Sequence, residues 1–114
     1  MTPVPYPSLL IRFTAEGVEG RASALLDTGF DGHLAIPETV VPTLPRPLYR
    51  RRVRTASGQI VRVAAYLGTV ELDDRPSVVD SIIIALGDEY LLGLSVLNRF
   101  KVTFDHGRRV IVEP

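Results

Sequence analysis

The sequence contains no cysteine and no tryptophan, and it has one methionine and one lysine, Lys101, beside twelve arginines. Without cysteine the chain has no disulfide framework, no thiolate metal site and no cysteine nucleophile. Its thirteen basic and thirteen acidic residues cancel, which argues against a generally cationic nucleic-acid binder and against an acidic tail. Any chemistry must therefore use carboxylates, hydroxyls, the two histidines or arginine.

Long apolar runs are also missing. No run approaches the roughly 18 residues of a membrane-spanning helix, and the opening MTPVPYP lacks the charged-then-apolar pattern of a signal peptide. We therefore expect a cytoplasmic protein without membrane contact. A length of 114 residues predicts a single domain over 1–114, and 46% apolar with 23% charged residues is typical of a globular chain. Pro3, Pro5 and Pro7 predict an extended arm over residues 1–7.

The remaining chain is dominated by strand patterns. Alternating or continuous apolar residues between turn signals predict strands, and leucines and a phenylalanine three apart predict one short helix over 94–100. The pattern predicts an all-β fold, a closed or partly closed barrel of short strands. The expected strands are 8–14, 18–26, 34–36, 48–56, 60–72, 78–86, and a closing hairpin of 101–105 with 108–113.

One short motif carries a chemical signal, the triplet Asp27-Thr28-Gly29. An aspartate at the end of a buried apolar strand costs desolvation energy unless hydrogen bonds or a partner compensate. Gly29 lets backbone approach the carboxylate closely, and Thr28 supplies a hydroxyl donor and acceptor. The triplet alone also suits an ordinary turn, so its surroundings decide how it is interpreted.

Those surroundings resemble the retropepsin-like aspartic proteases over most of the chain. The resemblance rests on the apolar strand before Asp27-Thr28-Gly29, the strand 34–36 after it, the hairpin tipped by Gly58, and the Leu-Leu-Gly-helix pattern over 91–100. The Asp-Thr-Gly-Phe run and the following apolar-Pro pair are most similar to prokaryotic members. The resemblance implies a retropepsin-like closed β-barrel and an aspartic endopeptidase that acts on peptides or proteins without cofactor or metal.

The resemblance also assigns roles. Asp27 would be the catalytic carboxylate, with Thr28 hydrogen-bonded across a dimer axis, and Gly29 and Asp31 would bind the peptide backbone. The tip Ser57-Gly58-Gln59 would close over the substrate as a flap. Because the chain has a single Asp-Thr-Gly and the mechanism needs two aspartates, the implied enzyme is a homodimer with its active site on the two-fold axis.

Two positions depart from the viral members of the family. Phe30 follows the triplet where the viral enzymes have a small residue, so its ring would line the substrate cleft and either narrow it or alter the hydration of the carboxyl pair. Leu94 stands where they have an arginine that supports the dimer, and the hairpin 101–113 is longer than their ending. We therefore expect a dimer interface that is built differently.

Other interpretations remain open. The same fold could serve as a peptide-binding module without hydrolysis. The basic cluster Arg46, Arg50, Arg51, Arg52 and Arg54 could select acidic substrates or hold a polyanion, but a solvated hairpin face explains it more simply, and nucleic acid is not an expected partner. His33 and His106 are too few for a metal site and are expected in turns or at the surface.

Overall fold

The computed structural model describes residues 7–54, 57–72, 77–106 and 109–114, so the predicted N-terminal arm lies outside it except for Pro7. These residues form nine strands, a short 3-10 helix and a short α-helix. The elements are β1 (Ser8–Ala15), β2 (Val18–Leu26), β3 (Leu34–Ile36), η1 (Glu38–Thr43), β4 (Tyr49–Arg54), β5 (Ile60–Leu72), β6 (Val78–Ala85), β7 (Leu91–Leu92), α1 (Leu94–Leu97), β8 (Lys101–Asp105) and β9 (Arg109–Glu113).

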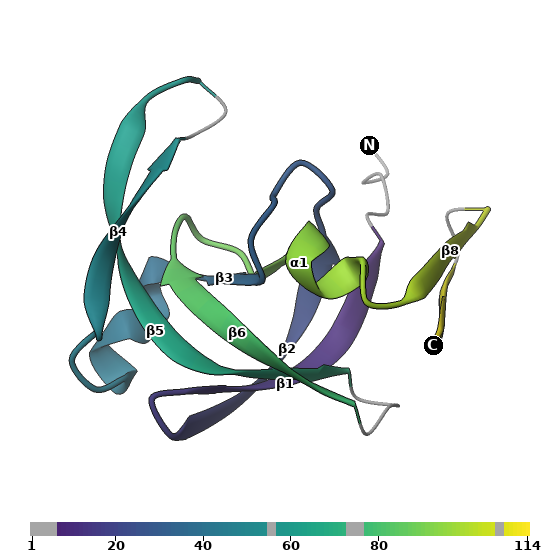
Figure 1. Ribbon diagram of the computed structural model, residues 1–114, viewed down its shortest axis with the longest axis horizontal. Helices are drawn as coiled ribbons and strands as arrows, with labels where there is room; N and C mark the ends of the chain where they lie inside the picture. Colours follow the sequence, from purple (N-terminus) through teal and green to yellow (C-terminus); the bar gives the residue numbers. More distant parts are fainter. Residues whose placement is uncertain (1–6, 55–56, 73–76, 107–108) are drawn as a thin grey trace, which may run out of the picture.

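Six strands close into a barrel, which confirms the predicted all-β closed architecture (Figure 1). The strand order is β1-β2-β7-β3-β6-β5, and β5 pairs again with β1, from Ala15 opposite Gly68 to Ile11 opposite Leu72. The long strand β5 continues past the barrel and pairs with β4 to form the predicted hairpin. Strands β8 and β9 make a separate two-stranded sheet beyond α1. Closure leaves the barrel itself without an open sheet edge.

Alternation along the strands fills the barrel. Ile11, Phe13 and Ala15 of β1 are buried, while the residues between them lie at or near the surface. On β6, Ile83 and Ile84 are buried and Ile82 is half-buried, so this strand is covered on both faces. The largest fully buried side chain is Tyr66 of β5. The core therefore follows from period-2 patterning, as the sequence indicates.

Two elements differ from the sequence-based expectation. The helix predicted over 94–100 is only Leu94–Leu97, and the chain then turns into β8. Leu91–Leu92 forms a strand that was not predicted, because two residues carry no periodicity. Strand β7 is formed by its pairing with two neighbouring strands, because it lies parallel to β2 and antiparallel to β3. No helix of the described residues is long and apolar enough to cross a membrane.

Candidate active site

Asp27 lies directly beyond the carboxyl end of β2, beside β7. Leu25 and Leu26 pair with Leu91 and Leu92, and the backbone N–H of Asp27 continues this ladder by donating to the carbonyl of Leu92 at 3.0 Å. On the other side, Leu26 N–H donates to the carbonyl of Pro7 at 2.9 Å. Backbone hydrogen bonds therefore hold Leu26 on one side and Asp27 on the other, and the sheet sets the position of Asp27.

The side chain of Asp27 is held by the turn that follows it. Its Oδ1 accepts the backbone N–H of Gly29 at 2.9 Å, and its carbonyl accepts the N–H of Phe30 at 3.2 Å. A Cβ at position 29 would lie 3.2 Å from the same Oδ1, closer than most Cβ contacts in proteins, so glycine suits this position. The carboxyl group is half-buried, and Thr28 beside it is exposed.

The loop over 27–33 is fastened to the start of α1. The N–H groups of Gly93, Leu94 and Ser95 donate to the carbonyls of His33 at 2.9 Å, Phe30 at 2.9 Å and Gly32 at 3.1 Å, respectively. The hydroxyl of Ser95 donates to the carbonyl of Asp31 at 2.6 Å. The Leu-Leu-Gly-helix pattern therefore supports the Asp27 loop directly, although more than sixty residues separate them in sequence.

A cavity of about 250 Å³ opens beside this loop. It is lined by residues 29–33 of the loop, by 51–54 of β4, and by Ile82 and Ile84 of β6. The predicted substrate-binding residues Phe30 and Asp31 are among its walls, together with Gly29. Phe30 packs against a buried group that includes Ala35 and Ile84, so its ring narrows this cavity from the barrel side.

The predicted flap tip lies at the end of the β4–β5 hairpin. Gly58 has a φ of +85°, a left-handed conformation that favours glycine at a hairpin turn. Ser57 and Gln59 beside it are exposed. None of these three residues lines the cavity beside the loop, and in Figure 1 the hairpin extends away from the barrel. The structure therefore brings Asp27, Gly29, Phe30 and Asp31 together and leaves the tip apart from them.

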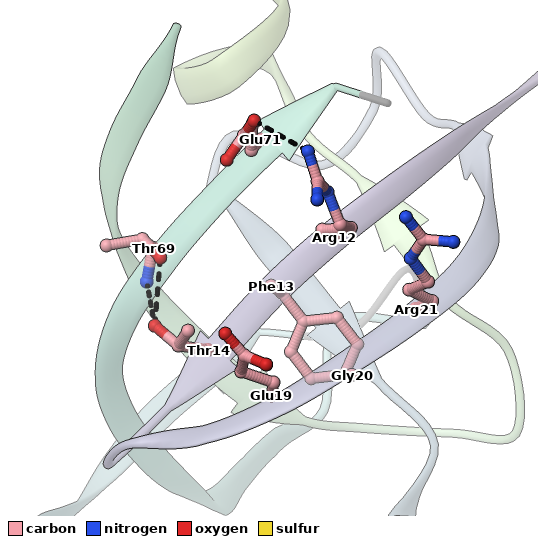
Figure 2. A pocket seen from close by; sticks show the side chains of 8 residues that line it. All are labelled: Arg12, Phe13, Thr14, Glu19, Gly20, Arg21, Thr69 and Glu71. Carbon is pink, nitrogen blue, oxygen red and sulfur yellow. Dashed lines mark hydrogen bonds and ion pairs between the residues drawn. The ribbon is translucent and has the colours of Figure 1, made fainter. Parts of the chain in front are cut away.

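A larger hollow of about 400 Å³ lies over β1, β2 and β5, and no residue of the Asp27 loop lines it (Figure 2). Two pairs of its side chains contact each other across β1 and β5. Arg12 forms an ion pair with Glu71 at 3.0 Å, and the hydroxyls of Thr14 and Thr69 lie 2.8 Å apart. These contacts join β1 to β5 where the barrel closes. We therefore assign this hollow to the seam of the barrel rather than to a reaction.

His33 has a role that the sequence did not reveal. The sequence suggested a turn or surface residue, but His33 is half-buried, and its Nδ1 accepts the N–H of Ile82 on β6 at 3.3 Å. Partial burial lowers its pKa, and the guanidinium groups of Arg99 and Arg51 lower it further. The neutral ring links the Asp27 loop to β6, and only tertiary structure could show this. Within the described parts of the chain, no three histidine, aspartate or glutamate side chains gather as metal ligands would.

We expect the domain to lose stability as the pH falls below about 6.5, the ordinary pKa of histidine. The folded state holds the pKa of His33 lower, so the unfolded chain takes up this proton first and unfolding becomes easier. The loss should level off once the folded chain is also protonated. Urea unfolding followed by circular dichroism between about pH 7 and pH 5 measures the effect. His33→Asn keeps an acceptor at this position but cannot titrate, so an unchanged pH dependence in that variant would contradict the assignment to His33.

No protein-family profile matches the sequence, and comparison with curated proteins finds no significant match. The geometry of the Asp27 loop and its surroundings is therefore the basis for assigning a function.

Proposed function

We propose that this protein is a retropepsin-like aspartic endopeptidase that hydrolyses peptide bonds as a homodimer. The observation that carries the proposal is the placement of Asp27. Its strand is held on both sides, its carboxyl oxygen accepts the N–H of Gly29, and the loop around it is bound to Gly93 and α1. Such support keeps a carboxyl group in one orientation at the surface of a rigid barrel, as a catalytic group requires.

The proposed reaction uses one water and two carboxyl groups that share a proton. One Asp27 carboxylate takes a proton from the water while the oxygen of the water attacks the scissile carbonyl carbon. The other, protonated Asp27 hydrogen-bonds the carbonyl oxygen and stabilises the developing charge. Collapse of the tetrahedral intermediate returns a proton to the leaving amine and breaks the C–N bond. No cofactor takes part in this scheme.

The second carboxyl group must come from a second chain. The sequence has one Asp-Thr-Gly, and no hydrogen bond joins Asp27 to another carboxylate of the described residues. Two copies facing each other across a two-fold axis would supply the pair. Thr28 is exposed beside Asp27, where it could hydrogen-bond across that axis. The β8–β9 hairpin projects from the barrel with Phe104 half exposed (Figure 1), which supports a dimer contact in this region.

The substrate would lie in the cleft between the Asp27 loop and the β4–β5 hairpin. Gly29 and Asp31 line the cavity there and would contact the peptide backbone, and Phe30 would contact a side chain. The tip Ser57-Gly58-Gln59 would close over the peptide. Movement of such a hairpin excludes water from the reacting bond and holds the substrate in place. The extended position of the hairpin supports this role as an open state.

The proposal is tested by measuring oligomeric state and cleavage together. Over a series of protein concentrations, the rate of cleavage of an unstructured protein in mildly acidic buffer should follow the dimer concentration found by sedimentation. Below the dissociation constant of the dimer, halving the protein should reduce the rate about fourfold, because dimer concentration depends on the square of chain concentration. A strictly monomeric active species would refute the shared site. Binding of peptides without any cleavage would assign the chain to the alternative, a peptide-binding module.

A further inference from the structure

The arginine cluster of the β4–β5 hairpin is divided between two faces. Successive residues of a strand point to opposite sides, so Arg51 and Val53 share one face of β4 while Arg50 and Arg52 share the other. Val53 packs against the buried group that contains Ala35 and Val63, which identifies its face as the one turned toward the Asp27 loop. Arg51 therefore faces the cleft, and Arg52 and Arg54 border the same cavity.

The opposite face forms a separate surface. Arg50, Arg52 and Arg62 line an outer hollow with Ile60, and Arg52 lies directly opposite Arg62 in the strand register. This hollow meets the cavity beside the loop at Arg52, which lines both. All three arginines are exposed, and Arg50 differs from Arg51 and Arg52 in lying outside the lining of the cavity beside the loop.

Positive charge also reaches the cleft from a second element. Burial lowers the pKa of His33, and the guanidinium groups of Arg99, which follows α1, and of Arg51 on β4 lower it further. Neither arginine forms an ion pair with a carboxylate of the described residues. The carboxylate that lines this cavity is Asp31, whose backbone carbonyl accepts the hydroxyl of Ser95. The charged side chains that line this cavity therefore carry a net positive charge.

One part of the cavity wall is apolar. Ile82, Ile84 and Phe30 line it beneath the arginines. Its volume of about 250 Å³ is suited to a single extended side chain rather than to a folded ligand. A side chain with one or two methylene groups and a terminal carboxylate would match both the apolar wall and the guanidinium group.

We propose that this cavity is a specificity subsite for an acidic side chain of the peptide substrate, Glu or Asp, and that Arg51 determines the preference. The inference rests on the proposed function, because a subsite requires a bound peptide. It deepens that function by naming the substrate class. Arg51 acts here on substrate binding and plays no part in the chemical step.

The test compares cleavage of an unstructured peptide library by the wild-type protein, Arg51→Glu and Arg50→Glu. At one position near the cleaved bond, the wild type should prefer Glu over Gln by about tenfold in kcat/KM, a difference of about 1.4 kcal/mol. Arg51→Glu should lose this preference and favour Lys instead. Arg50→Glu makes the same charge change on the other face of the same strand and should retain the preference. Circular dichroism verifies that both variants fold.

The outcomes separate the two proposals. Cleavage with equal rates for Glu and Gln peptides would overturn the subsite and leave the endopeptidase intact. A preference lost equally in both variants would show a general charge effect and overturn the role of Arg51. If the wild type cleaves nothing, the endopeptidase proposal fails, and binding of fluorescent Glu and Gln peptides then decides the subsite. Equal affinity for the two peptides would reject it, and tighter binding of the Glu peptide that Arg51→Glu abolishes would support it.

Discussion

Replacing Asp27 by asparagine is expected to reduce cleavage of an unstructured peptide by at least about a thousandfold while leaving the fold intact. An amide cannot act as a base toward water or share a proton with its partner. Its oxygen can still accept the N–H of Gly29, the bond that holds the loop turn. The measurements are kcat/KM on a fluorogenic peptide and urea unfolding followed by circular dichroism. Equal cleavage by both proteins would remove Asp27 from the mechanism.

The same variant should also inhibit the wild type when the two are mixed. If two chains share one site, a mixed dimer has a single aspartate and is inactive. With about a tenfold excess of Asp27→Asn chains and random pairing, activity per wild-type chain should fall to about a tenth. An excess of an unrelated protein is the control for crowding and adsorption. Activity that stays proportional to the wild-type chain would show that one chain suffices and would refute the two-fold site.

The second large effect is expected at Gly93. A Cβ at this position would collide with the backbone carbonyl of Gly32 and lie 2.8 Å from the carbonyl of Phe30. Because both carbonyls belong to the loop that carries Asp27, the loop itself would have to move. Gly93→Ala is therefore expected to destabilise the fold by about 3 kcal/mol and to reduce cleavage far more than stability alone explains. Urea unfolding measures the loss of stability. The loss of cleavage is measured as kcat/KM under conditions in which the variant remains folded.

Ser95→Ala is the matched control for Gly93→Ala. It removes one hydrogen bond to the same loop, from the hydroxyl to the carbonyl of Asp31, without adding any atom. Its expected cost is about 1 kcal/mol. If Gly93→Ala were no more destabilising than Ser95→Ala, the close approach of the loop to Gly93 would not matter for the fold, and the proposed support of Asp27 would be wrong.

The strands were predictable where their own side chains set the pattern. In β1, Ile11, Phe13 and Ala15 alternate with surface residues, and one buried face requires that arrangement. Strand β7 was not predictable, because its two leucines become a strand only between β2 and β3. The helix was predicted three residues too long, since the turn after Leu97 is not marked by any breaker in the sequence.

The candidate site also contains residues that the sequence identified and contacts that it did not. Local chemistry identified Asp27 and Gly29, since a carboxylate at the end of an apolar strand needs close backbone donors, and Gly29 supplies one. The division of the arginines followed from strand alternation once the inner face was known from the packing of Val53. The contact of His33 with Ile82 joins residues 49 apart, and no local pattern signals such a contact.

By itself, the sequence determined which chemistry is open to this protein and which residues could perform it. A chain without cysteine, with one Asp-Thr-Gly and alternating apolar strands, specifies a carboxylate at a strand end in an all-β domain, because burial and hydrogen bonding act on neighbouring residues. Only the tertiary structure decided which six strands close the barrel, that Gly93 supports the Asp27 loop, and that Arg51 faces the cleft. Those outcomes depend on pairing between distant strands, whose register is set by packing of the whole core rather than by any single segment.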